Sequence, residues 1–262
     1  MKLRAAAGSQ LLAAALAAMA AALVAACATT VQQEIAAEPP TATETLSYFP
    51  FQVKGYQNSY PRRRILVLMP VDARDFKDAA GQSHDPLDGN PATGVMLGPD
   101  GAVVQRVYSS PLGPILQGAI VRAADEAGML ATASNDTLEA ALKESNEDYV
   151  LASRITRCWV NKHTGTDVNA SPSAGPGWFT TADVDLDVTI YKPPFNVAFW
   201  QGESGATYND PPADNGSGMG DDVPIYDRPS EVLSVALTRA VAGTFKREAL
   251  HGLVVQDTVR IH

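Results

Sequence analysis

Cysteine, histidine and aromatic residues are scarce in this chain of 262 residues. It holds two cysteines and four histidines, and Phe, Trp and Tyr together make up 7%. Basic residues are also in the minority, because 20 Lys and Arg face 29 Asp and Glu and give a formal charge of −9. An acidic chain repels phosphate backbones, which argues against nucleic acid as a partner. With 45% hydrophobic residues the composition is nevertheless that of a globular protein.

The sequence also lacks the short motifs that most often carry catalysis. The HExxH pattern of zinc hydrolases, the GxSxG elbow and the GxxxxGK[ST] phosphate loop do not occur. The histidines are His84, His163, His251 and His262, and their spacing fits no local metal motif. We therefore expect no enzymatic activity, no catalytic residue, no metal site and no cofactor.

The longest apolar run lies at the N-terminus. Two basic residues precede an uninterrupted apolar stretch over 11–26. A membrane-spanning helix needs about 20 apolar residues, so this shorter run is typical of a signal peptide. The run ends in Val-Ala-Ala-Cys over 24–27, which matches the lipobox of bacterial lipoproteins. The resemblance implies cleavage before Cys27, a diacylglyceryl group on its sulfur and a further acyl chain, such as palmitate, on its new amino group.

A lipidated Cys27 predicts attachment to a membrane, because two or more acyl chains anchor a protein stably. Ala28 stands where an Asp would favour the inner membrane, so we expect the outer membrane, with the chain facing the periplasm; the inner membrane stays open. Loss of 1–26 removes two basic residues and no acid, which takes the formal charge from −9 to −11. Cys158 then has no partner for an intrachain disulfide, and we expect it to be a buried, small hydrophobic side chain.

The chain divides into three segments on composition. Residues 1–26 are the lipoprotein signal peptide, 27–62 the lipidated Cys with a flexible tether, and 63–262 a single periplasmic α/β domain. The tether is rich in Ala, Thr, Glu and Pro and has no sustained hydrophobic period. Its aromatic latter part, over 48–60, could lie on the domain or on a partner, or form a loosely packed arm.

Hydrophobic periodicity over 63–262 predicts strands and helices in a mixed order. The expected strands are 65–71, a hairpin of 93–97 and 102–108, 148–160, 178–191, 197–208 and a short terminal strand over 253–255. The expected helices are 112–127 ended by Gly128, about 135–145 capped by Asn135, and about 230–245 capped by Ser230. Strands beside helices that cover one face predict an α+β fold, a two-layer sandwich with a mixed, largely antiparallel sheet.

The lipobox and this order of elements together resemble small periplasmic envelope lipoproteins. The group includes auxiliary lipoproteins of ABC-type transport systems and the curli-assembly lipoprotein. The matching segments are 64–70, 148–155, 184–191, 198–203 and 235–241, and the loops 72–110 and 209–229 are longer than in this group. The resemblance implies a non-catalytic accessory or adaptor subunit of a cell-envelope transport or assembly complex, and it transfers no catalytic residue.

Clusters of acidic residues leave a metal-assisted hydrolase as a less favoured function. Asp183, Asp185 and Asp187 alternate along one strand and so share one face. We expect a solvated face, answered by Arg154 and Lys162. Further acids lie near His84 and in a Gly-rich loop over 209–222, which lacks the ligand spacing of an EF-hand.

Three tryptophans leave a second alternative, a periplasmic binding module for a lipid or glycan. Trp159, Trp178 and Trp200 fall on or beside predicted strands. Packing in the core or at a sheet edge is expected for them, whereas exposed rings would offer a stacking surface.

Overall fold

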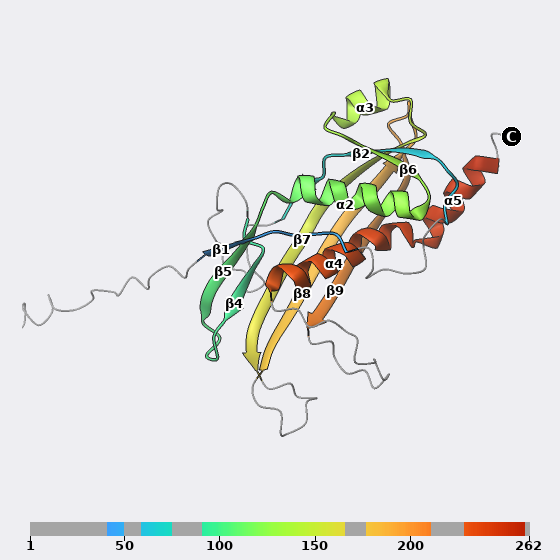
Figure 1. The fold of residues 1–262 in the computed structure, drawn as a ribbon. Helices are drawn as coiled ribbons and strands as arrows, with labels where there is room; N and C mark the ends of the chain where they lie inside the picture. Colours follow the sequence, from blue (N-terminus) through green and yellow to red (C-terminus); the bar gives the residue numbers. More distant parts are fainter. Residues whose placement is uncertain (1–40, 50–58, 75–90, 166–176, 211–227, 260–262) are drawn as a thin grey trace, which may run out of the picture. The chain divides into compact units, whose positions relative to one another are not determined.

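One long strand, β7 (Tyr149–Gly165), runs through the centre of a nine-stranded sheet in the computed structural model (Figure 1). The structure describes residues 41–49, 59–74, 91–165, 177–210 and 228–259. The other strands are β1 (Thr41–Glu44), β2 (Arg64–Leu68), β3 (Val71–Asp72), β4 (Gly94–Leu97), β5 (Val103–Ser109), β6 (Leu130–Ser134), β8 (Gly177–Tyr191) and β9 (Ala198–Asp210). The helices are α2 (Leu112–Ala127), α3 (Leu138–Glu144), α4 (Pro229–Phe245) and α5 (Glu248–Val259). The α+β class expected from the sequence is confirmed.

The two edges of β7 are used differently. One edge pairs antiparallel with β8 along its length, and β8 pairs antiparallel with β9. The other edge is shared by three short parallel strands: β2 at 149–151, β3 at 154–155 and β4 at 160–163. The sheet is mixed, as expected. Antiparallel pairing dominates by ladder length, although five of the eight strand pairs are parallel.

The helices α2 and α4 cover one face of this sheet and bury the main core (Figure 1). Alternate residues of β8, among them Val184, Leu186 and Val188, point into that layer and are at most 1% exposed. On the opposite face, α3 packs at one end only, where Leu68 and Leu142 belong to a small separate cluster. The structure is thus a two-layer sandwich with α3 as a local addition to the second face.

The capping residue predicted from the sequence is correct for α2 and wrong for α3 and α4. Gly128 ends α2 with φ 103°, as predicted. Thr137, not Asn135, caps α3, because its hydroxyl accepts the N–H of Ala140. Ser230 is not the cap of α4 but lies inside its first turn. The carboxylate of Glu231 accepts the backbone N–H of Arg228, which is the residue at the cap position.

The short terminal strand expected over 253–255 is wrong, since these residues lie within α5. Their branched side chains favour a strand, but Leu250 and Val254, four residues apart, both turn into the core. The strands β1 and β6 were not expected from the sequence. Both are short, and each gains its hydrogen bonds from a parallel partner far along the chain.

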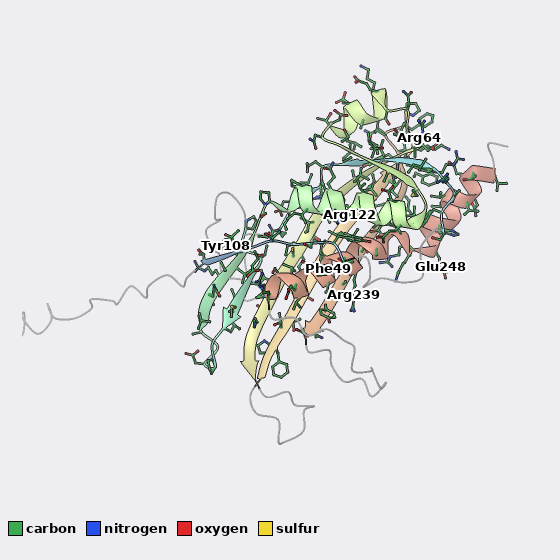
Figure 2. All side chains as sticks on the ribbon, viewed as in Figure 1. Phe49, Arg64, Tyr108, Arg122, Arg239 and Glu248 are labelled. Atoms are coloured by element: carbon green, nitrogen blue, oxygen red, sulfur yellow. The ribbon has the colours of Figure 1, made fainter. Side chains whose placement is uncertain are left out.

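The latter part of the segment expected to be a tether contacts the domain. The compact unit spans Pro39–His262, and within it Leu46 and Tyr48 belong to the core. The N–H groups of Ser47 and Phe49 donate to the hydroxyls of Ser234 and Thr238 on α4 (Figure 2). We call residues 45–49 the strap. Two extended residues of the strap advance by about 6.8 Å and four residues of α4 rise by about 6 Å, so successive N–H groups of the strap meet hydroxyls on successive turns of the helix.

A polar network holds α5 against the sheet. The hydroxyl of Tyr149 donates to Asp257 at 2.8 Å, and Lys192 also contacts the Asp257 carboxylate. Burial alone would raise the pKa of Asp257, but the hydrogen bonds from Lys192 and Tyr149 outweigh it and hold the pKa below its ordinary value. Arg63 adds a contact to Thr258. The last turn of α5 is therefore fixed by charge as well as by packing.

We expect Gly94→Ala to destabilise the fold, because a Cβ at this position would lie 2.1 Å from the carbonyl oxygen of Val160 on β7. The strands would have to separate, at about 1–3 kcal/mol. Gly118→Ala on α2 is the matched control, since nothing lies within 4 Å of its Cβ position, and it should stabilise the helix by about 0.5–1 kcal/mol. Urea unfolding of both variants measures the difference, and equal effects would contradict the close approach of β4 and β7.

Acid should loosen α5. The pKa of Asp257 is lower in the folded than in the unfolded chain, so its carboxylate stabilises the fold above the unfolded-state pKa of about 3.9, and this contribution is lost as pH falls through the folded pKa. We expect Asp257→Asn to lower the free energy of unfolding at neutral pH by about 1–3 kcal/mol. The variant should also lose less stability than wild type on acidification to about pH 3. If the free energy of unfolding falls equally with pH in the variant and in wild type, Asp257 does not contribute to the acid sensitivity of the fold.

Candidate functional site

The face of β7, β8 and β9 that points away from α2 and α4 is lined by charged residues. Asp183, Asp185 and Asp187 do share this face, as the sequence predicted, while their neighbours on β8 are buried. The ion pair to Asp183 comes from Arg157, at 3.0 Å, rather than from the expected Arg154. A register shift between Ile155 and Arg157 accounts for this, because the following residues of β7 change their partners.

A cleft of about 670 Å³ opens where this face meets the outer edge of β9. Its lining residues are Asp187, Trp200, Gln201, Gly202, Glu203, Arg247 and Ala249. The strands β8 and β9 supply the first five, and the turn from α4 into α5 supplies the other two. We call this the β9 cleft. Its lining is rich in polar groups, which favours a polar or charged ligand.

Arg247 closes one side of the β9 cleft. Its guanidinium donates to the backbone carbonyl of Glu203 at 2.6 Å. Glu203 and Arg247 are 44 positions apart in sequence, and the short turn after α4 brings them together. The bond also shows that the Glu203 carbonyl points outward from the sheet, because an oxygen bonded within the ladder would face β8.

Trp200 packs over Gly202, which has no side chain. A Cβ on Gly202 would lie 2.6 Å from the six-membered ring of Trp200, so the indole lies directly over the glycine. The register partner of Trp200 is Ile190, and both belong to the main core. The Trp200 ring, which is 8% exposed, therefore lies on the helix-covered face of β9, and the carboxylates of Asp187 and Glu203 lie on the opposite face. The β9 cleft is thus lined from both faces of β9 at its outer edge.

Two carboxylates stand side by side at the mouth of the β9 cleft. Asp187 and Glu203 are register partners on β8 and β9, which places their Cβ atoms about 5 Å apart. Neither forms an ion pair with another described residue. In the neighbouring register pairs of β8 and β9 each acidic residue is opposite a neutral one: Asp185 pairs with Gly205, and Asp183 pairs with Thr207. Arg247 also lines the cleft and Arg154 is the register partner of Asp187 on β7, so the two carboxylates stand near cations without an ion pair among the described residues.

Several residues singled out from the sequence lie outside the described part of the chain or away from the cleft. Cys27, His84, His262 and most of the Gly-rich acidic loop fall outside the described residues. His163 and His251 are described but do not line the cleft: His251, one helical turn beyond Arg247, contacts Ser59 and Tyr60, and His163 lies beside Phe179. The structure therefore does not bring the histidines and acids together among the residues it describes.

Metal binding and membrane insertion find no further support in the described chain. No group of three or more His, Cys, Asp or Glu side chains there is arranged to hold a metal ion. Likewise, none of the helices over residues 41–259 that the structure describes is long and apolar enough to cross a membrane.

Comparison with known proteins gives only remote likeness. No family model matches the chain, and no curated protein is similar to it. A solved structure of protein XCC0632 from Xanthomonas campestris, of family DUF330, is 15% identical and covers 85% of this chain and 99% of that chain, with a TM-score of 0.44. Lipoprotein GNA1162 from Neisseria meningitidis is 12% identical over 76% and 96% (TM-score 0.24), and a putative lipoprotein from Caulobacter crescentus is 10% identical over 64% and 92% (TM-score 0.30). Similarity at this level assigns neither a family nor a function.

Cys158 should be unreactive in the folded protein. It is 2% exposed, as the sequence predicted, and burial raises the pKa of its thiol to about 12. Thiolate is the reactive form, so we expect no labelling by a maleimide at pH 8 in buffer and complete labelling in urea. Rapid labelling of the native protein would show that the strand β7 opens locally around this residue.

Proposed function

We propose that the chain is a lipid-anchored bacterial envelope lipoprotein that acts as a non-catalytic accessory or adaptor subunit of a cell-envelope transport or assembly complex. The observation that carries the proposal is the open, charged face of β7, β8 and β9. It is joined by the N-terminal signal-peptide pattern, which ends in a sequence that matches a lipobox. The domain faces the periplasm, and the residue after Cys27 favours the outer membrane over the inner membrane.

The tether sets how far the domain can stand from the lipid. Residues 28–38 separate Cys27 from the compact unit, which begins at Pro39. The chain from Cys27 to Pro39 reaches at most about 40 Å when fully extended. A lipid on Cys27 would therefore keep the domain next to its membrane, within reach of the periplasmic parts of a membrane complex.

The open face has the size of a protein interface. The strand β8 has 15 residues, which at about 3.4 Å each is about 50 Å, and three strands spaced about 4.8 Å apart are about 14 Å wide. The product, about 700 Å², is close to the roughly 800 Å² that each partner buries in a standard complex. Apart from α3 at one end, no helix of the described chain covers this face.

The two alternative functions have less support. A lipid- or glycan-binding module needs exposed aromatic planes, whereas Trp159 and Trp200 are 7% and 8% exposed. For a metal-assisted hydrolase, no group of three or more His, Cys, Asp or Glu side chains among the described residues is arranged to hold a metal ion, and His84 lies outside those residues. The charged face therefore favours a protein partner.

Two measurements on the full-length protein in its native membranes test the proposal. Labelled palmitate should enter the wild-type chain and not Cys27→Ser, and the variant should move from the membrane to the soluble fraction. A photo-crosslinking residue at Asp185, on the open face, should then give discrete adducts with envelope transport or assembly subunits. The same residue at Arg122, on the exposed side of α2, is the matched control (Figure 2).

The adducts at position 185 should disappear when Cys27→Ser is combined with the photo-crosslinker. Palmitate incorporation by the Cys27→Ser variant would contradict the anchor. The same adducts from positions 185 and 122, or none from position 185, would contradict docking by the open face.

A further inference from the structure

The outer edge of β9 is open to pairing. Within the described chain β9 pairs only with β8, and its 13 residues make it a long edge strand. Since the Glu203 carbonyl points outward to Arg247 and directions alternate along a strand, the N–H and C=O groups of Gly205 and Thr207 also point outward. Unpaired groups of this kind are a ready template for an additional strand.

The residues along this edge allow another backbone to come close. Gly202 and Gly205 interrupt β9 with positions that carry no side chain, a feature that often marks close approach of a ligand or backbone. Both glycines are also required locally, because a Cβ would meet the Trp200 ring at one and the Asp185 carboxylate, at 2.2 Å, at the other. Neither glycine adds a side chain of its own beside the outward hydrogen-bonding groups of the edge, and the Trp200 ring and the Asp185 carboxylate occupy the space over them.

The charges beside the edge select the partner. Asp187 and Glu203 face each other across the strands without an ion pair, and like charges in this arrangement repel. Arg154 is the register partner of Asp187 on β7, and Arg247 reaches the Glu203 backbone from the other side. Two carboxylates in contact with one cleft would be stabilised by the cationic side chain of a ligand.

We propose, on the basis of the adaptor function above, that the outer edge of β9 and the β9 cleft bind an extended, basic segment of the partner protein. The segment adds a strand antiparallel or parallel to β9, with its main chain on the outward N–H of Glu203 and on the outward N–H and C=O groups of Gly205 and Thr207. One Lys or Arg side chain of the segment lies against Asp187 and Glu203.

A synthetic peptide provides the probe. A fluorescein-labelled peptide of four Lys-Thr repeats, with blocked ends, is titrated with the full-length lipoprotein in detergent micelles at fixed ionic strength, and binding is followed by fluorescence anisotropy. A peptide of four Glu-Thr repeats tests charge. Free lysine amide, added as a competitor, separates pairing by a strand from simple capture of a small cation.

Four variants test the individual contacts. Glu203→Gln and Asp187→Asn each remove one charge, and each should weaken binding of the Lys-Thr peptide about tenfold. Thr207→Pro removes an outward N–H, which an edge strand tolerates, and should also weaken binding. Thr207→Ala is its matched control, because it loses the hydroxyl that donates to Asp183 but keeps the N–H. Melting temperatures verify that each variant is folded.

Binding of the Lys-Thr peptide to wild type and Thr207→Ala, with weaker binding to the other three variants, would support the proposal. Equal binding of the Glu-Thr peptide would overturn it, as would unchanged binding to Thr207→Pro or competition by lysine amide at the same concentrations as the unlabelled peptide. If the peptide does not bind but the photo-crosslinks from position 185 persist, the edge proposal fails and the adaptor function stands. If the crosslinks fail as well, both are contradicted.

Discussion

The fold depends on how one strand satisfies both of its edges. On one side β7 has a single long partner, β8, but on the other its hydrogen bonds are divided among β2, β3 and β4, which leaves a gap between the last two. The guanidinium of Arg74 fills this gap: it forms two bonds to Asp72, at 2.9 and 2.7 Å, reaches the carbonyl of Ala92, and is 8% exposed. A buried charge of this kind is tolerated only when paired. The other edge of β7 carries the long ladder out to β9, with register shifts at Ile155/Arg157 and at Ile190/Tyr191.

That ladder gives the molecule two different faces from one alternating pattern. Over 182–190 every second residue of β8 is apolar and buried under α4, and Asp183, Asp185 and Asp187 lie between them. Asp183 is satisfied by Arg157 and by the hydroxyl of Thr207. Asp187 is not satisfied in this way and faces Glu203. Repulsion between like charges on adjacent strands costs up to about 1 kcal/mol, which the large core beneath can absorb. The unsatisfied pair therefore persists at the position where a basic ligand would relieve it.

Periodicity in the sequence predicted the long elements well, because burial of one face decides their structure. The strands β7, β8 and β9 and the helices α2 and α4 each present a continuous apolar stripe to the core. The β9 cleft could not be predicted, since it depends on a turn that brings Arg247 to a strand 44 positions earlier. Its one local signal was the spacing of Trp200 and Gly202, in which a large ring precedes a residue without a side chain on the same face. The strap over 45–49 escaped prediction because its partners, Ser234 and Thr238, lie almost 190 positions away.

The anchored end of the chain and the β9 cleft are connected through α4, and this connection bears on how the protein would work as an adaptor. The chain enters the domain at β1, from which the strand order runs through β5, β4, β7 and β8 to β9. Five spacings of about 4.8 Å place the two edges about 24 Å apart across the sheet. The hydrogen bonds of the strap to α4 would transmit any pull on the lipid into the helical layer. Helix α4 packs on β9, where the hydroxyl of Ser204 donates to the carbonyl of Ala240. The turn after α4 brings Arg247 to the Glu203 backbone, so a pull on the lipid would reach the β9 edge through this helix.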